Sequence, residues 1–319
     1  MEENKIVGRF APTPSGMLHL GNLFCSLLAW LYAKSGGGEI ILRIEDLDSA
    51  RCPRVNADKL ARDLEWLGLT WDRGAYCGGD SDSYFQSNRF AIYEEYFNRL
   101  AARGLLYPCF CSRGELHAAS APHLSDGRVI YPGTCRSLTA AEIAARSQKR
   151  HPAYRLRVND TPICFTDGHY GPCSYKLTEE CGDFIVRRSD GIYAYQLAVT
   201  IDDALMGVTQ VVRGCDLLAS TPVQLYIYNL LGFTPPHFTH IPLLTAQDGR
   251  RLAKRDGDLD LDIMRRQCDS PDAIIGYLAW LAGQIEHPKP VSPIELVKIF
   301  NPNKIPRHNI PVPPQLPRL

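Results

Sequence analysis

The chain has 319 residues, of which 45% are hydrophobic and 22% are charged. This composition is ordinary for a folded globular protein, and it excludes a collagen-like repeat, a coiled coil and a wholly disordered chain. The 35 Lys and Arg residues balance the 35 Asp and Glu residues, so no overall positive charge attracts nucleic acid. Any contact with RNA must therefore come from a local patch.

The first 106 residues alternate strand patterns with helix patterns, joined first by a turn rich in Pro and Gly and later by an acidic turn. Strands are predicted at residues 6–10 and 39–44, and helices at 20–34, 55–67 and 88–103. The first helix has an apolar face formed by Leu23, Leu27, Leu28 and Leu31. This order predicts a parallel sheet with crossover helices.

Residues 107–182 are different, with short segments, many cysteines and many turn residues, which indicates an inserted module. We expect the sheet to continue over 183–245, followed by a basic loop and a helical part over 246–285. After the insertion, strands are predicted at 184–187, 193–200, 208–212 and 240–244, and a helix at 217–231. A last helix is predicted to start at Ser270 and Pro271, with its apolar face over 273–281.

The last segment, residues 286–319, contains nine Pro among its 34 residues. Because Pro interrupts helices and central strands, we predict a tail that is extended on the body or disordered.

The cysteine count and the N-terminus indicate the compartment. Eleven Cys is an odd number, and the start, Met-Glu-Glu-Asn-Lys, is charged where a secretory signal would be apolar. We therefore predict a cytoplasmic protein with free or metal-bound thiols. The longest nearly apolar run, residues 23–33, is shorter than the roughly 20 residues of a membrane span.

The loop at residues 11–22 connects the first strand to the first helix and has the features of a phosphate site. Backbone amides at a helix N-terminus attract phosphate, and His19 and Asn22 are spaced to share one face there. Gly16 and Gly21 leave room for a ligand to approach closely. The alternative is that this loop is a plain connection.

A second basic element lies between Gly249 and Gly257. A mobile cationic loop of this kind can close over a triphosphate, although charge runs are often only solvated surface. Its positive residues are Arg250, Arg251, Lys254 and Arg255.

The segments GRFAPTPSGMLHLGN and GRRLAKRDGD resemble the HIGH and KMSKS signatures of class I aminoacyl-tRNA synthetases. Together with LRIEDLD, YAYQLAVTIDDALMGVTQVVRG and HIPLLTAQDGRRLAKR, they resemble the glutamyl branch of that class over residues 6–256. The resemblance implies an α/β fold: a Rossmann-like catalytic domain with an inserted zinc-binding module and a small helical C-terminal part. Two departures are Asn22, in place of the second His, and Ala253, in place of a small hydroxyl residue.

The resemblance also implies a reaction and the residues that perform it. In adenylate formation, a carboxylate of L-glutamate attacks the α-phosphate of ATP, which is expected to carry Mg²⁺. His19 and Lys254 would be catalytic, stabilising the charge on phosphorus and on the departing pyrophosphate. With them, Gly21 and Asn22 would bind ATP.

For glutamate, the resemblance implies a pocket of mixed charge. Arg9 and Arg213 would bind carboxylates, Glu45 the ammonium group, and Tyr195 would donate a hydrogen bond. The alternatives are surface strand positions for the arginines, a helix-capping carboxylate for Glu45 and a core position for Tyr195. The remaining pocket residues would be Phe10, Ala11, Pro12 and Thr13.

Cys109 and Cys111, followed by Cys135, offer three soft ligands that suit one tetrahedral Zn²⁺ per chain. By proximity, the fourth ligand could be His117, His123 or Tyr131, and spacing alone favours a His. The resemblance implies Tyr131, because related synthetases without an anticodon domain use a Cys-x-Cys and a Tyr-x-x-x-Cys arrangement. The alternative is that these are ordinary buried thiols.

Only 64 residues follow Arg255, too few for the large helical anticodon-binding region of a full glutamyl-tRNA synthetase. This length resembles the synthetase-like enzymes that attach glutamate to queuosine at the wobble position of tRNA(Asp), where the anticodon stem-loop enters the active site. We expect such an enzyme to act as a monomer. The alternatives are a truncated glutamyl-tRNA synthetase that charges an acceptor end, and a non-catalytic paralogue that binds the adenylate or RNA.

Overall fold

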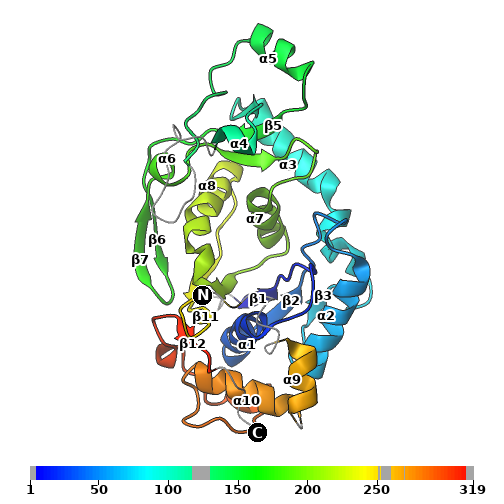
Figure 1. Cartoon of the computed structure of the whole chain (residues 1–319), viewed down its shortest axis with the longest axis vertical. Coiled ribbons are helices and arrows are strands. Elements are labelled where there is room, and N and C mark those ends of the chain that lie inside the picture. Colours follow the sequence, from blue (N-terminus) through cyan, green and yellow to red (C-terminus); the bar gives the residue numbers. More distant parts are fainter. Residues whose placement is uncertain (1–4, 117–129, 251, 253–259, 269, 314–319) are drawn as a thin grey trace.

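A parallel sheet forms the centre of the catalytic part in this computed structural model, which describes residues 5–116, 130–250, 252, 260–268 and 270–313 (Figure 1). Its strands are β1 (Val7–Phe10), β2 (Glu39–Leu42), β3 (Arg73–Gly74), β9 (Gln210–Gly214) and β10 (His237–Ile241). The order β1-β2-β3 is parallel throughout, and β9 pairs in parallel with β10. β9 lies beside β1, where the amide of Thr209 donates to the carbonyl of Val7 at 3.0 Å. The predicted continuation of the sheet after the insertion is confirmed.

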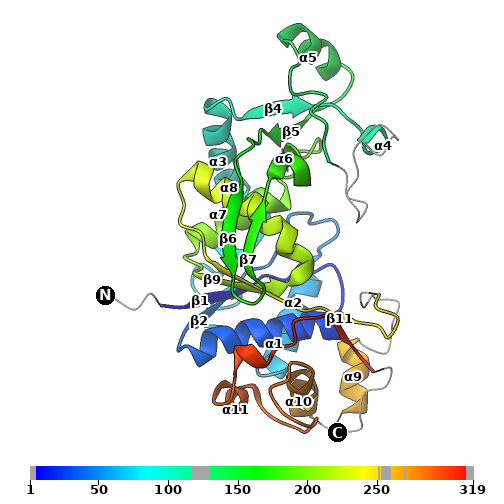
Figure 2. The same cartoon turned by 90° about the vertical axis from the view of Figure 1, so that its left-hand side faces the viewer.

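Helices cover both faces of this sheet. Figure 2 shows α1 on one side of β1 and β9, with α7 and α8 on the other. The predicted helices of the first half are confirmed to within a few residues, whereas α8 begins later than predicted because a 3₁₀ segment precedes it. The bounds are α1 (Leu20–Ser35), α2 (Arg54–Trp66), α3 (Phe90–Ala102), α7 (Tyr195–Leu205) and α8 (Thr221–Leu231), with 3₁₀ segments at Ser81–Tyr84, Gln86–Asn88, Cys215–Ser220 and Pro302–Lys304.

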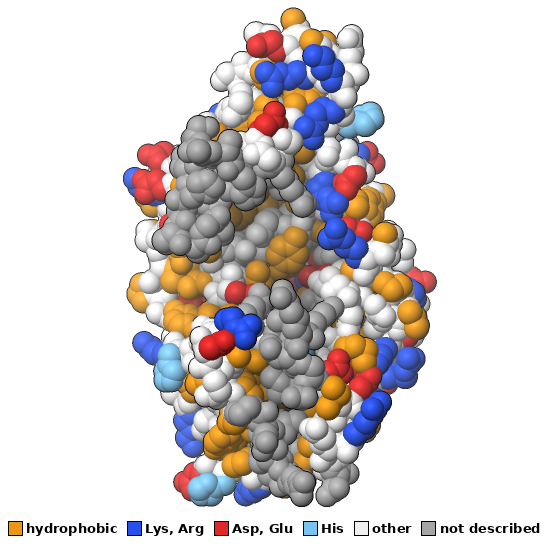
Figure 3. Space-filling model, in the orientation of Figure 1, with side chains coloured by type: hydrophobic (Ala, Val, Ile, Leu, Met, Phe, Trp, Pro, Cys, Tyr) orange, Lys and Arg blue, Asp and Glu red, His pale blue; other side chains and the backbone are white. Residues whose placement is uncertain are grey.

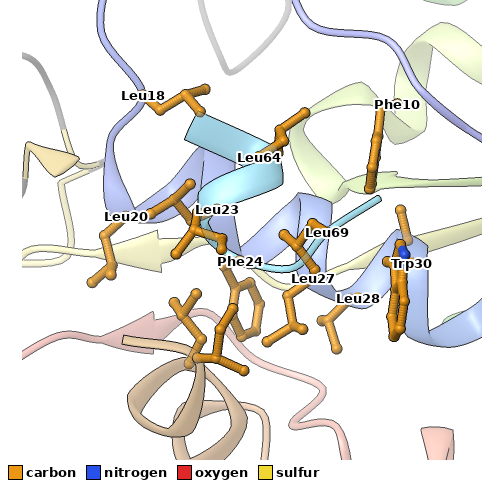
Figure 4. Close-up of a cluster of buried hydrophobic side chains, with 14 of the residues drawn as sticks. Phe10, Leu18, Leu20, Leu23, Phe24, Leu27, Leu28, Trp30, Leu64 and Leu69 are labelled. Carbon is orange, nitrogen blue, oxygen red and sulfur yellow. The ribbon is translucent and has the colours of Figure 1, made fainter. Parts of the chain in front are cut away.

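The largest hydrophobic core surrounds α1 (Figure 4). The four leucines predicted to face the core are fully buried: Leu23, Leu27, Leu28 and Leu31. Phe24, Ala29 and Trp30 are buried as well, so this helix is covered on more than the one predicted face. The reason is that α1 lies between the sheet and the C-terminal elements, and its Tyr32 ring contacts Phe300 edge-on at 5.1 Å.

Two predicted strands need correction. The strand predicted at 193–200 is wrong, because α7 begins at Tyr195 and buries Leu197, Ala198 and Ile201. A short apolar run fits a buried helix as well as a strand, so alternation alone misled the prediction. The strand predicted at 240–244 is divided at Pro242, which has no amide to donate, into the end of β10 and a separate β11 (Leu244–Thr245).

The inserted module has its own small sheet, at one end of the long axis (Figure 1). β4 pairs with β5, and β5 with β8, all antiparallel, so this sheet includes a strand beyond the expected border at residue 182. The hairpin of β6 and β7 extends from the module toward the central sheet (Figure 2). The bounds are β4 (Leu106–Cys109), α4 (Arg113–Leu116), α5 (Ala140–Ser147), β5 (Ala153–Leu156), β6 (Ile163–Asp167), β7 (Gly171–Tyr175), α6 (Leu177–Glu180) and β8 (Phe184–Arg187).

The C-terminal part differs most from its prediction. α10 (Pro271–Leu281) starts at the predicted Ser270 cap, whereas α9 (Leu261–Gln267) was not predicted. The tail lies on the body, which is one of the two predicted alternatives, and it pairs there through β12 (Ile310–Pro311). The expectation that it contains no helix is wrong, because it contains α11 (Pro293–Val297). Pro293 occupies the first position of α11, where the missing amide costs nothing. No helix in the described part of the chain is long and apolar enough to cross a membrane.

Candidate active site

A cavity of about 550 Å³ lies where β1 ends and α1 begins. The carboxyl ends of parallel strands are the usual ligand site of such sheets. In the same region, Figure 3 shows a hollow at mid-height with hydrophobic side chains inside it. The cavity brings together every predicted pocket residue that the structure describes: Arg9, Phe10, Ala11, Pro12, Thr13, His19, Gly21, Asn22, Glu45, Tyr195 and Arg213. Leu252 also lines it, whereas the predicted Lys254 lies outside the described residues.

His19 is the N-cap of α1 and forms a capping box with Asn22. Its Nδ1 accepts hydrogen bonds from the amides of Gly21 at 3.1 Å and Asn22 at 3.4 Å, and the Asn22 side chain accepts from the His19 amide at 3.2 Å. Because Nδ1 is an acceptor, the proton of the neutral ring is on Nε2, which makes Nε2 a donor. A Cβ atom at position 21 would lie 3.1 Å from His19 Cε1, so glycine leaves room for the His19 ring.

Two arginines supply buried positive charge. Arg213 donates from Nε to His240 Nε2 at 3.0 Å, from Nη1 to Gln224 Oε1 at 2.9 Å and from Nη2 to Thr221 Oγ1 at 2.8 Å. Arg9 donates to the Val212 carbonyl at 3.3 Å, and within the described part of the chain its buried Nε has no hydrogen-bond partner. Hydrogen bonds therefore hold the Arg213 guanidinium group in position, and Arg9 Nε lies 3.6 Å from the Asp203 carboxylate.

A buried ion network lies beneath the cavity. Arg43 is fully buried and binds Asp203 at 2.7 Å and Glu45 at 3.1 Å. Asp202 lies 3.8 Å from Arg43 and binds Arg89 at 2.7 Å, so the network reaches α3 and α7. Burial raises the pKa of Glu45, and the nearby guanidinium groups partly offset this. The network places the Glu45 carboxylate at the cavity wall.

Tyr195 is the first residue of α7 and lines the same cavity, half-buried. Burial, together with the negative charge of Glu45, raises the pKa of its hydroxyl group. The hydroxyl group therefore stays protonated at neutral pH and is available as a hydrogen-bond donor.

Several buried residues that support this cavity are not among the predicted site residues. Each is a charged or titratable residue inside an apolar segment: Arg43, Asp202, Asp203 and His240. A charged residue inside an apolar segment was the available signal for a buried ion pair, because charged side chains are rarely fully buried without a partner.

The three predicted cysteines lie together in the module. The Sγ atoms of Cys109, Cys111 and Cys135 are all within 4.8 Å of one another, and Tyr131 Oη is 3.5 Å from Cys109 Sγ and 4.0 Å from Cys111 Sγ. His117 and His123 lie outside the described residues. Burial and the neighbouring thiols raise the pKa of Cys111 to about 12.

Other groups orient these sulfur atoms. Arg155 donates to Cys109 Sγ at 3.2 Å and lies over the Tyr131 ring, with Cζ 3.6 Å from its centroid. The amide of Phe110 donates to Cys135 Sγ at 3.4 Å. Donors of this kind around the sulfur atoms are typical of a metal site's outer shell.

The parallel sheet, the histidine-capped helix and the cavity all lie in the part of the chain that matches a known family. Residues 5–308 match the family of class I tRNA synthetases for glutamate and glutamine (E and Q), catalytic domain. The chain belongs to this family, and it is a ligase of the aminoacyl-tRNA synthetase type.

Curated relatives differ in how much of their length they share with this chain. The glutamyl-Q tRNA(Asp) synthetase of Symbiobacterium thermophilum is 50% identical over 311 residues, 97% of this chain and 96% of the relative. The protein of the same name from Nitratidesulfovibrio vulgaris is 46% identical, with the same shares. Glutamate–tRNA ligase 1 of Halorhodospira halophila is 41% identical over 96% of this chain but only 64% of the relative.

A solved structure has the same fold. The glutamate tRNA ligase of Elizabethkingia meningosepticum, crystallised with its amino acid, is 30% identical with a TM-score of 0.81. The match covers 96% of this chain and 67% of that one. Nearly all of this chain therefore has the fold of about two thirds of that ligase.

Proposed function

We propose that this protein activates L-glutamate with ATP as glutamyl adenylate and transfers the glutamyl group to queuosine at the wobble position of tRNA(Asp). The observation that carries the proposal is the single cavity that holds two buried arginines, the Glu45 carboxylate and the N-terminus of α1. Glutamate has two carboxylates and one ammonium group, and the charges of this cavity complement them.

In the proposed first step, one oxygen of the glutamate α-carboxylate attacks the α-phosphorus of ATP, and pyrophosphate leaves. His19 donates from Nε2 to a phosphate oxygen, and the α1 N-terminus adds its dipole. Arg9 and Arg213 bind the carboxylates, Glu45 the ammonium group, and Tyr195 donates a hydrogen bond. Lys254 would stabilise the departing pyrophosphate, which Mg²⁺ would accompany.

In the proposed second step, a hydroxyl group of the queuosine cyclopentenediol attacks the mixed anhydride, and AMP leaves. The anhydride is already activated, so this step needs a positioned nucleophile and no new catalytic group. Support for this acceptor comes from the relatives named glutamyl-Q tRNA(Asp) synthetase, which match over 96% of their length. The glutamate–tRNA ligase relative matches over 64% of its length.

Pyrophosphate exchange tests the first step. Purified protein should exchange labelled pyrophosphate into ATP with L-glutamate, without tRNA. Lys254→Ala should slow this at least about tenfold, a loss of about 1.4 kcal/mol of transition-state stabilisation. Lys298→Ala, at an exposed position, is the control. Equal exchange with L-aspartate would contradict glutamate activation, and absence of exchange would favour the binding paralogue.

The acceptor is tested with four RNAs: tRNA(Asp) with queuosine or guanine at the wobble position, the queuosine form lacking its terminal adenosine, and the queuosine-containing anticodon stem-loop alone. We expect glutamate transfer to the three queuosine RNAs and none to the guanine form. Transfer to the guanine form that is lost with the terminal adenosine would instead identify an acceptor-end synthetase.

We further propose that Cys109, Cys111, Tyr131 and Cys135 bind one structural Zn²⁺. The distances among the sulfur atoms and Tyr131 Oη fit a tetrahedral ion, and four protein ligands leave no open position for water. Elemental analysis should find one zinc per chain, and Cys135→Ser should lower it strongly. Cys164→Ser, an exposed thiol in the same module, is the control. One zinc per chain in Tyr131→Phe would reject Tyr131 as the fourth ligand but not the metal site itself.

A further inference from the structure

Behind the candidate glutamate pocket, three buried side chains form a continuous chain of hydrogen bonds. The Asp167 carboxylate lies 2.6 Å from His240 Nδ1, and His240 Nε2 lies 3.0 Å from Arg213 Nε. Asp167 is 2% exposed and His240 is fully buried. Of these three residues, only Arg213 lines the cavity.

The chemistry of the outer two groups fixes the tautomer of the central one. An arginine can only donate, so His240 Nε2 must accept, and Nδ1 must carry the proton that is donated to Asp167. A protonated ring would place a second donor against Arg213. Burial lowers the pKa of His240, opposed by Asp167 and assisted by Arg213, which favours the neutral ring.

The charged and titratable groups around this chain come from several elements. Arg9 on β1 adds positive charge near His240, and the negative charge of Asp167 contributes to the raised pKa of Tyr32 on α1 and of Tyr170 and Cys173 in the hairpin. Burial raises the pKa of Asp167, but hydrogen bonds from His240 and from the amides of Tyr170 and His169 outweigh it, so the net direction is down. Asp167 is therefore ionised at neutral pH.

Asp167 comes from the inserted module, not from the central sheet. It is the last residue of β6, and the hairpin tip reaches the level of β9 (Figure 2). The next residue, Gly168, donates its amide to the Phe238 carbonyl at 2.9 Å. A side chain at Gly168 would meet Thr239 Oγ1 at 2.3 Å, so glycine allows the hairpin to lie against β10.

We propose that the β6–β7 hairpin is a working part of the glutamate site, in which Asp167 sets the tautomer of His240 and His240 holds Arg213 in its carboxylate-binding orientation. Asp167 and His240 are positioning residues, since neither lines the cavity. The proposal rests on the proposed function, in which Arg213 binds a carboxylate of glutamate.

The kinetic test is glutamate-dependent pyrophosphate exchange by the full chain. Asp167→Asn can donate to Nδ1 and so favours the wrong tautomer, and we expect the KM for glutamate to rise at least tenfold with the KM for ATP changed less than twofold. His240→Leu should behave in the same way. His240→Gln, whose oxygen can accept from Arg213, should recover most of the loss. The matched controls are Asp160→Asn and His237→Gln, at exposed positions in the module and on β10.

A pH series adds a measurement that general loss of packing would not change. In the wild type, the KM for glutamate should stay level near neutral pH and rise in acid as His240 gains a proton. That rise should be smaller in His240→Gln, where protonation of Glu45 still contributes but protonation of His240 does not. Equal KM values for Asp167→Asn and the wild type, equal effects on ATP and glutamate, or an acid limb of the same size and position in His240→Gln would each overturn the proposal.

Nitrogen NMR of the wild-type histidines tests the tautomer without any activity. The His240 signals, assigned by their loss in His240→Gln, should show a protonated Nδ1 and an unprotonated Nε2 at neutral pH. The opposite tautomer would overturn the positioning role. Absence of glutamate-dependent exchange in the wild type would instead contradict the proposed function, and the NMR result would still decide the tautomer.

Discussion

At the scale of single residues, His19 has two separable roles. Its Nδ1 caps α1, and its Nε2 is the proposed donor to phosphate. Asparagine is a good N-cap residue but cannot supply the same ring donor. A substitution can therefore keep one role and remove the other.

We expect His19→Asn to slow glutamate-dependent exchange by about 10–100-fold while the free energy of unfolding in urea stays within about 0.5 kcal/mol of the wild type. His19→Ala should slow exchange similarly and also cost about 0.5–2 kcal/mol of stability, because the cap is lost. Exchange at the wild-type rate in His19→Asn would refute the catalytic role.

Arg43 shows how strongly a buried charge depends on its partners. It is fully buried between Asp203 and Glu45, and each of these acids would be left without its closest cation if Arg43 were removed.

Arg43→Met should therefore lower the free energy of unfolding by about 3–5 kcal/mol, measured by urea denaturation. Arg99→Met removes an exposed ion pair with Glu95 on α3 and should change stability by less than about 1 kcal/mol. Similar losses of unfolding free energy in both variants would show that the buried network stabilises the protein no more than an exposed ion pair does.

At the scale of elements, α10 is shaped by the chain that crosses it. A Cβ atom at position 276 would lie 1.7 Å from the carbonyl oxygen of Lys289. The helix therefore needs a residue without a side chain where the tail crosses it. Helix propensity alone favours alanine over glycine by about 0.5–1 kcal/mol.

Gly276→Ala should nevertheless destabilise the protein by about 1–3 kcal/mol, because the tail backbone has to move. Gly114→Ala on α4, where an added side chain meets nothing within 4 Å, should be neutral or slightly stabilising. Thermal unfolding of both variants separates packing from propensity, and a higher Tm for Gly276→Ala would reject the close contact.

At the scale of the whole molecule, the Pro-rich tail completes the main hydrophobic core. β12 pairs in parallel with β11 next to the candidate active site. The tail residues in the core are Leu296, Ile305, Ile310 and Val312.

Two neighbouring positions on α11 test this role. Leu296 is fully buried, so Leu296→Ala should cost about 2–5 kcal/mol of unfolding free energy. Ile294 is 63% exposed, and Ile294→Ala should cost no more than about 0.5 kcal/mol. A loss below about 1 kcal/mol for Leu296→Ala would show that the tail is only loosely attached.

Features that depend on residues close together in the chain were predictable from the sequence. The apolar spacing of Leu23, Leu27 and Leu31 predicted α1, and the loop before it, with His19, predicted a ligand site at the helix N-terminus. The spacing of Cys109 and Cys111 predicted a thiol cluster. Periodicity, capping and short ligand spacings are local properties, so they can be read along the chain.

Features that join distant segments became visible only in the folded structure. Asp167, His240 and Arg213 come from β6, β10 and β9, and no spacing along the chain shows that they meet. α7 and the short helix α11 were not predicted, because their apolar residues obtain a defined face only when the sheet and α1 lie against them. The physical reason is that burial and buried charge pairing depend on contacts between segments, which local patterns do not contain.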